Sequence, residues 1–205
     1  MQNRMEAELS RAADILRGGG VVAFPTDTIY GLGALADNSV AIDRIFKIKR
    51  RPITQALPLL AADEAQAMSV TRFVPETAKL LMARFWPGAL TLVLPRAIWM
   101  SEMITAGGLT IAVRVPDHPL TIALIEAAGG PLVGTSANIH GHPNPTTAGD
   151  VQSQLGDSVD FIVDGGQVLG GTESTVVDVT VNPPRIIRQG AITRAAIEQV
   201  TPVVY

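Results

Sequence analysis

The chain has 205 residues, of which 47% are hydrophobic and 17% are charged, and its formal net charge at pH 7 is −3. This much apolar material suits one folded domain with a substantial core and excludes a disordered chain. The slight negative charge excludes a protein coated with cations for nucleic acid, so any RNA contact would be a local patch. There is no cysteine, which excludes disulfide bonds, thiol nucleophiles and cysteine-based zinc sites.

The N-terminal segment predicts a helix rather than a targeting signal. Its apolar residues Met5, Leu9 and Leu16 have helical spacing, and Gly18–Gly20 end the pattern. The segment lacks the uninterrupted apolar core of a signal peptide, and no apolar run approaches the ~20 residues of a transmembrane helix. We therefore expect a cytoplasmic protein with no membrane contact.

The next elements alternate between strand and helix. Residues 21–24 predict a buried strand that Pro25 ends. A second helix begins at Asn38 or Ser39, whose side chains suit an N-cap, and Pro52 ends it. Beyond this point the pattern predicts strands over 56–60, 89–95, 109–116, 131–137 and 160–166. It predicts helices over 75–86, 118–130 and 193–200, and a short helix between 138 and 159. A closing hairpin is predicted from the strands 174–180 and 185–190. This order predicts one α/β domain, residues 1–205, built on a mixed sheet.

A cluster of cations marks the end of the second helix. Arg44, Lys47, Lys49, Arg50 and Arg51 are five of the 16 Lys and Arg residues of the whole chain. Such residues offset the negative end of a helix dipole, which is one explanation of the cluster. The alternative is an anion site, because arginine offers a bidentate fork and lysine a point charge to phosphate or carboxylate.

A polar segment, "FPTDTIYGLGALA", follows the first strand over residues 24–36. The segment is either an ordinary turn or a rim on which the hydroxyls of Thr26, Thr28 and Tyr30 orient a small ligand. Its glycines formally match a dinucleotide-binding pattern. We reject that interpretation, because the next helix starts too late to place its N-terminus under a pyrophosphate.

Several charged or hydroxylated residues lie in or beside apolar strands. Arg114 interrupts an apolar strand and needs either an internal acid or a ligand carboxylate. Ser174 and Thr175 begin another strand, where hydroxyls commonly satisfy backbone groups. Arg188 ends the strand after that and is a candidate phosphate contact.

A second polar loop follows the strand over 131–137. Ser136, Asn138 and Asn144 lie where a strand of an α/β protein ends, which is a common place for ligands. His140 and His142 form an H-x-H pair in the same loop, and a metal site there would need a third ligand that the sequence does not supply. A solvated loop is the alternative for the pair.

The chemistry of these candidates is that of an anion site without a covalent nucleophile. The chain has no P-loop, no G-x-S-x-G elbow and no evident Ser/His/Asp set. Arginine, lysine and neutral hydroxyls bind and neutralise anions, which favours phosphoryl or nucleotidyl transfer through positioning and charge neutralisation.

Several motifs, in one order along nearly the whole chain, resemble the YrdC/Sua5 threonylcarbamoyl-AMP synthases. They are "PTDTIYGLG", "KRRP", "WPGALTLVL", "VRVPDHP", "GTSAN", "STVVDV" and "IRQG". The resemblance is to the short, single-domain form, and it implies a twisted mixed sheet with flanking helices and an open, concave, positively charged cavity. It also implies a nucleotidyltransferase that converts L-threonine, bicarbonate and ATP with Mg²⁺ into L-threonylcarbamoyl-AMP and pyrophosphate. Partner transferases would pass the threonylcarbamoyl group to adenosine 37 of tRNAs that read ANN codons, so a tRNA contact is possible.

The resemblance also implies roles for individual residues. Catalysis by charge neutralisation is expected from Lys49 and Arg51. The nucleotide is expected to contact Lys49, Arg51, Thr110, Ser136, Asn138, Asn144 and Arg188, and L-threonine to contact Thr28, Tyr30, Arg114 and Ser174. Gln55 and Ala56 depart from the His, Asn or Lys and the proline that are frequent in the family, which puts a substrate contact of Gln55 in doubt.

Two other functions remain open from the sequence. An RNA-binding module would use a positive cavity and stacked aromatics, but Phe24, Phe46, Phe85 and Phe161 all occupy apolar helix or strand positions. Chemistry on carbamoyl phosphate, as in hydrogenase maturation, occurs in related domains of much longer chains with zinc-finger segments.

Overall fold

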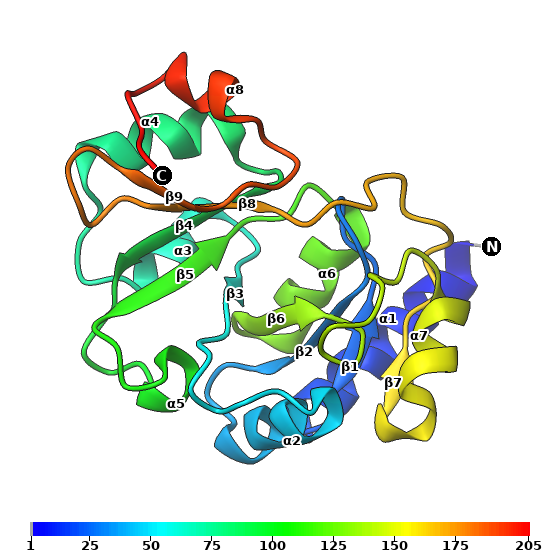
Figure 1. Ribbon diagram of the computed structural model, residues 1–205. Helices are drawn as coiled ribbons and strands as arrows, with labels where there is room; N and C mark the ends of the chain where they lie inside the picture. Colours follow the sequence, from blue (N-terminus) through cyan, green and yellow to red (C-terminus); the bar gives the residue numbers. More distant parts are fainter. Residues whose placement is uncertain (1) are drawn as a thin grey trace.

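A nine-stranded sheet organises the fold, and the computed structural model describes residues 2–205 (Figure 1). The strand order is β7-β1-β2-β6-β3-β5-β4-β8-β9. The elements along the chain are α1 (Gln2–Arg17), β1 (Val22–Phe24), β2 (Gly31–Leu35), α2 (Ser39–Lys49), β3 (Leu59–Leu60), α3 (Glu64–Ser69), α4 (Glu76–Phe85), β4 (Leu90–Pro95), α5 (Glu102–Thr105), β5 (Thr110–Arg114), α6 (Pro119–Ala128), β6 (Leu132–Ser136), α7 (Ala148–Leu155), η1 (Gly156–Ser158), β7 (Phe161–Ile162), β8 (Thr175–Asp178), β9 (Arg185–Arg188) and α8 (Arg194–Glu198).

The sheet is mixed, as the sequence predicts. Three neighbouring pairs, β1 with β7, β3 with β5 and β4 with β8, are parallel, whereas the remaining pairs are antiparallel. The closing hairpin is confirmed, because β8 and β9 pair in antiparallel fashion. The predicted strands over 56–60 and 160–166 shrink to two residues each, β3 and β7.

One prediction about the sheet is wrong. The glycine-rich part of the segment over 24–36 is not a loop but the internal strand β2, which pairs with β1 and β6. Glycine has low strand propensity, so the residue pattern of this segment does not predict a strand. The glycines are needed because the chains approach closely: a Cβ on Gly33 would lie 2.6 Å from the carbonyl oxygen of Val133 in β6.

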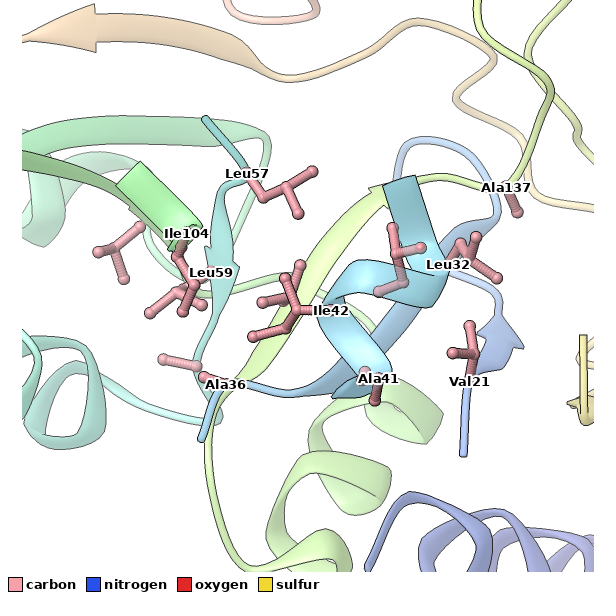
Figure 2. Packing of buried hydrophobic residues seen from close by; sticks show 14 of the residues in the cluster. Val21, Leu32, Ala36, Ala41, Ile42, Leu57, Leu59, Ile104 and Ala137 are labelled. Atoms are coloured by element: carbon pink, nitrogen blue, oxygen red, sulfur yellow. The ribbon is translucent and has the colours of Figure 1, made fainter. Parts of the chain in front are cut away.

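Helix α2 covers one face of the central strands and α1 with α6 cover the other. Ile42 of α2 is fully buried in the same cluster as Leu32 of β2 and Leu59 of β3, and Figure 2 shows these side chains together. Burying one such side chain contributes about 1.5–3 kcal/mol. On the opposite face, Leu16 of α1 and Leu124 of α6 pack in a second cluster. The short helices α3 and α5 were not predicted.

A third cluster stabilises the other end of the sheet. Helices α4 and α8 pack Leu81 and Ile197 against β4 and β8, which form the upper part of the view in Figure 1. Among residues 2–205, none of the helices combines the length and the apolar character that crossing a lipid bilayer requires. The strand register places Gly31 opposite Ser136, and it places Leu60 beside Arg114 and opposite Leu132 at the other end of β6.

Candidate active site

An open cavity of about 140 Å³ lies against these strands. Its lining comes from the segment after β1, the ends of β2, β3, β5 and β6, and the segments around β8 and β9: Thr26, Thr28, Ile29, Gly31, Arg51, Pro58, Leu60, Thr91, Arg114, Gly134, Thr135, Ser136, Glu173, Ser174 and Arg188. Three guanidinium groups and several hydroxyls therefore face one space.

Arg51 reaches the cavity because of the way α2 ends. Arg50 adopts a left-handed conformation with φ of 51°, and its N–H and that of Arg51 return to carbonyl oxygens of the last turn. This turn ends α2 at Lys49. The helix therefore stops before Pro52, the residue from which the sequence predicts its end. The Arg51 Nη2 donates to the carbonyl of Ala56 at 2.8 Å, whereas its buried Nε has no partner in the described part of the chain. A buried donor without an acceptor favours an anion or water at this point.

The rest of the cation cluster serves the fold. Arg44 forms a two-pronged ion pair with Asp160 at 2.8 and 3.0 Å, and Lys47 pairs with Asp43 at 2.5 Å. Arg51 is the member of the cluster that lines the cavity. Lys47 and Lys49 lie in the last turn of α2, as the helix-dipole explanation requires, and the anion site stays a prediction for Arg51.

Lys49 lies behind the cavity wall rather than in it. The side chain is 1% exposed, and its ammonium donates to the carbonyl oxygen of Ser136, to the carbonyl oxygen of Asn138 at 2.8 Å and to Asn138 Oδ1 at 3.0 Å. Burial, followed by repulsion from Arg51, lowers the pKa of Lys49 to about 8. Lys49 therefore connects the end of α2 to the end of β6 through hydrogen bonds. Its ammonium is not among the groups that line the cavity.

Asn138 continues this connection into the second polar loop. Its Nδ2 donates to the carbonyl oxygen of His142 at 2.6 Å, so the amide fixes the loop that carries the half-buried Asn144. The side chains of His140 and His142 are exposed. Within residues 2–205, no group of three His, Cys, Asp or Glu residues is arranged to hold a metal ion.

Arg114 has the internal acid that one of its two explanations requires, and the contact with a ligand carboxylate stays a prediction. Its Nη2 pairs with Asp27 Oδ1 at 2.5 Å, Nη1 donates to Thr28 Oγ1 at 3.0 Å and Nε donates to the Gly88 carbonyl at 2.8 Å. Burial lowers the pKa of Arg114, and Asp27 acts in the opposite direction. The guanidinium still borders the cavity, and Asp27 holds it in place there.

The hydroxyls of the segment after β1 divide between shaping the turn and lining the cavity. Thr26 Oγ1 donates to the Ile29 carbonyl at 2.7 Å and contacts Thr28 Oγ1 at 2.9 Å, and both threonines border the cavity. Tyr30 does not border the cavity, contrary to expectation. It is fully buried, and its hydroxyl donates to the Gly166 carbonyl at 2.7 Å, so it holds the loop before β8 instead.

Two segments of the C-terminal hairpin complete the cavity. Ser174 Oγ lies 2.8 Å from the Thr91 hydroxyl, and Arg188 Nη2 donates to the Ser174 carbonyl at 2.9 Å. Thr175, by contrast, accepts backbone N–H groups of the following segment, as hydroxyls at strand starts commonly do. Sequence reasoning missed Glu173, which lines the cavity and pairs with Arg188 at 2.6 Å. The only signal was its position directly before Ser174.

Two other positions lie away from the cavity lining. Thr110 starts β5 and Arg114 ends it, so the two are about 13 Å apart along an extended strand. Gln55 also lies outside the lining, and the contact of Ala56 with Arg51 uses its backbone carbonyl, which does not depend on the side chain.

Comparisons with known proteins agree with this fold. The family model Sua5_yciO_yrdC, described as "Telomere recombination", matches residues 14–190. A threonylcarbamoyl-AMP synthase from Bacillus subtilis is 46% identical over 196 residues, covering 95% of this chain and 57% of that protein. The structure of Pyrococcus abyssi Sua5 complexed with L-threonine has a TM-score of 0.93 and 41% identity, covering 96% of this chain and 58% of that one.

A shorter relative is also similar. The crystal structure of Escherichia coli YciO has a TM-score of 0.81 and 31% identity, covering 89% of this chain and 88% of that one. The chain thus spans a little over half the length of the Bacillus and Pyrococcus proteins and most of the length of YciO. Because the family match covers most of the chain and the Bacillus relative is 46% identical, the chain belongs to the Sua5/YciO/YrdC family.

Proposed function

We propose that the protein is a threonylcarbamoyl-AMP synthase, an enzyme that transfers the adenylyl group of ATP to threonine carbamate. The observation that carries the proposal is the cavity, in which Arg51, Arg114 and Arg188 converge with hydroxyls and no cysteine or histidine. Relatives over nearly the whole chain bear the name of this activity, and the Pyrococcus protein has been solved with L-threonine.

The reaction needs no nucleophile from the protein. The amine of L-threonine and bicarbonate give a carbamate and water, and a carbamate oxygen attacks the α-phosphorus of ATP. The bond from that phosphorus to the bridging oxygen breaks, and pyrophosphate leaves with its electron pair. The protein must align the two substrates and neutralise the charge that gathers on the phosphates, which is work for fixed cations and dipoles.

Different groups in the cavity lining suit the two substrates. We assign the threonine carboxylate to Arg114, with Thr28 and Ser174 beside it, because Asp27 holds this guanidinium rigidly. We assign the phosphates to Arg51 and Arg188, because Arg51 has the unpartnered donor.

Other residues act indirectly in this proposal. Lys49 and Asn138 are positioning residues, because their contacts fix Ser136 at the cavity edge and the loop that carries Asn144. Tyr30 positions the loop that leads to Glu173 in the same way. Thr110 remains a predicted nucleotide contact, at the far end of β5.

Mg²⁺ enters with ATP and supplies additional neutralisation of the phosphate oxygens when it is bound. The product would pass to transferase proteins that act on adenosine 37 of tRNA in the cytoplasm. An RNA-binding function has less support, because no aromatic side chain lines the cavity in the described part of the chain to stack a base.

Pyrophosphate release tests the proposed function. The assay contains ATP and Mg²⁺, with bicarbonate and each amino acid added in turn, for the wild type, Arg51→Ala and Lys47→Ala. We expect release that requires both bicarbonate and L-threonine, falls by about 100-fold in Arg51→Ala and is unchanged in Lys47→Ala, which alters an exposed ion pair outside the cavity. Background release with every amino acid would contradict the proposal.

A further inference from the structure

Glu173 is the feature of the cavity that anion binding does not explain. Among the residues that line the cavity it is the one carboxylate, and it lies beside the arginines assigned to the phosphates. Its Oε2 is 2.6 Å from Arg188 Nη1, and its charge also acts on Arg51. A carboxylate at this point repels a bare triphosphate, so a site built for phosphates alone would not contain it.

The backbone holds Glu173 firmly at the cavity. The Ala191 N–H donates to the Glu173 carbonyl at 2.9 Å, and Gly171 N–H donates to the Thr28 carbonyl at 2.7 Å just before it. Gly190 has no room for a side chain, because a Cβ there would lie 2.3 Å from the Glu173 carbonyl oxygen. Backbone contacts therefore fix the chain on both sides of Glu173, although residues 169–172 just before it are exposed.

Arg188 couples the carboxylate to the rest of the site. The same guanidinium bonds the Ser174 carbonyl at 2.9 Å and the Glu173 carboxylate at 2.6 Å. About a third of the Glu173 side chain is exposed, and the residue lines the cavity, so one oxygen can meet a ligand while the other stays with Arg188. This carboxylate is held in place beside Arg51 and Arg188, the two arginines assigned to the phosphates.

A divalent cation resolves the conflict between the carboxylate and the triphosphate. Mg²⁺ in nucleotide sites is usually held by substrate phosphates, several waters and only one or two protein carboxylates. The residues present fit this pattern, since Glu173 supplies one carboxylate and Arg51 and Arg188 supply cations for the remaining phosphate oxygens.

We propose that Glu173 is the protein carboxylate that receives the Mg²⁺ of the incoming MgATP, either directly or through a water of the metal. The inference rests on the proposed function, because it assumes that the cavity binds ATP. In this role Glu173 discriminates between ATP with bound Mg²⁺ and ATP without the metal. Glu173 attracts the metal and repels uncovered phosphates, so it selects the form of ATP that is ready for transfer.

Calorimetric binding of adenosine α,β-methylene triphosphate tests this inference without turnover. The affinity is measured once with Mg²⁺ and once with excess EDTA, for the wild type and Glu173→Gln. The control is Glu198→Gln, because Glu198 forms an ion pair of the same length, 2.6 Å, with Arg194 on α8, away from the cavity. We expect the wild type and the control to bind the Mg²⁺ complex more tightly than the free nucleotide.

In Glu173→Gln the preference for the Mg²⁺ complex should fall by about 10- to 100-fold, the usual effect of losing a group that tunes a metal site. Part of this fall should appear as tighter binding of the metal-free nucleotide. Equal changes in both affinities, or an unchanged preference, would overturn the inference. Absence of binding by the wild type in both conditions would instead contradict the proposed function.

A second variant guards against a folding defect. Glu173→Asp keeps the charge on a shorter side chain and should retain part of the preference, with the same thermal unfolding as the wild type. Electron paramagnetic resonance of Mn²⁺ with the analogue gives an independent reading. The ternary spectrum should differ between the wild type and Glu173→Gln, and identical spectra would also overturn the inference.

Discussion

The buried ammonium of Lys49 makes the stability of the protein depend on pH in a defined window. Burial and repulsion from Arg51 lower the pKa of Lys49 from an ordinary 10.5 to about 8. Between these two values the unfolded chain holds a proton that the folded chain has lost. The free energy of unfolding therefore rises as the pH increases through this window, and the cost of the buried charge is fully present below it.

The pKa difference sets the size of the effect. The interval from 10.5 to about 8 corresponds to about 3 kcal/mol in all, at about 1.4 kcal/mol per pH unit. Between about pH 7.5 and about pH 9.5, Lys49 should add about 2 kcal/mol to the free energy of unfolding. Urea denaturation at both pH values measures this gain, and subtraction of the Lys49→Met result removes the contributions of other titrating groups.

Nuclear magnetic resonance gives the pKa itself. The chain has three lysines, Lys47, Lys49 and Lys79, so selective ¹³C labelling yields a small set of Cε signals, and Lys49→Met assigns one of them. We expect that signal to titrate with a midpoint near 8. A midpoint at 10.5 or above, with no excess pH dependence of stability over Lys49→Met, would refute the reasoning. The oxygens around the ammonium would then compensate fully for its burial.

Three further changes have expected outcomes. Arg51→Ala removes the guanidinium with the unpartnered donor, so the Kd for the ATP analogue should rise by about 10- to 100-fold in calorimetry, with Lys47→Ala as the unchanged control. Asp27→Ala leaves Arg114 buried without its acid, which should lower the free energy of unfolding in urea by about 3–5 kcal/mol. Gly33→Ala forces a Cβ to 2.6 Å from a carbonyl oxygen of β6 and should cost about 1–3 kcal/mol in the same assay.

Each of these expectations has a result that contradicts it. An unchanged Kd in Arg51→Ala would mean that the nucleotide binds elsewhere. A loss below about 1 kcal/mol in Asp27→Ala would mean that Arg114 finds another partner or water. For Gly33→Ala the matched control is Gly130→Ala, whose Cβ would make an ordinary contact at 3.5 Å, and equal costs of the two changes would contradict the close approach of β2 and β6.

Much of the fold could be predicted from periodicity, whereas strand β2 could not. The helices around Leu9 and Ile42 have regular apolar spacing, and the structure confirms them as α1 and α2. Strand β2 reads "GLGAL" and lacks the branched residues that mark strands. β2 can pair with β6 because Gly33 has no Cβ to contact the Val133 carbonyl oxygen. That close approach exists only in the assembled sheet, so the segment alone does not predict it.

The candidate site could be predicted as a set, but not the direction of each side chain. Arg51 and Lys49 are two residues apart, and the left-handed turn at Arg50 sends one into the cavity and leaves the other beneath β6. No local pattern predicts that turn at an arginine. Tyr30 was expected in the cavity for its hydroxyl, yet tertiary packing buries it against the loop before β8.

Glu173 shows a different limit of sequence reasoning. A search for anion-binding residues selects cations and hydroxyls, so it passes over an acid that stands among them. Only the contact with Arg188 and the position in the cavity lining draw attention to it.

Mass spectrometry of the nucleotide products tests the proposed synthase activity most directly. The protein is incubated with ATP, Mg²⁺, L-threonine and ¹³C-labelled bicarbonate, and the products are separated at once because the mixed anhydride hydrolyses. The account predicts a nucleotide that contains AMP, threonine and the labelled carbon, formed in step with pyrophosphate. Unlabelled AMP as the sole product, or ATP left unchanged, would contradict it.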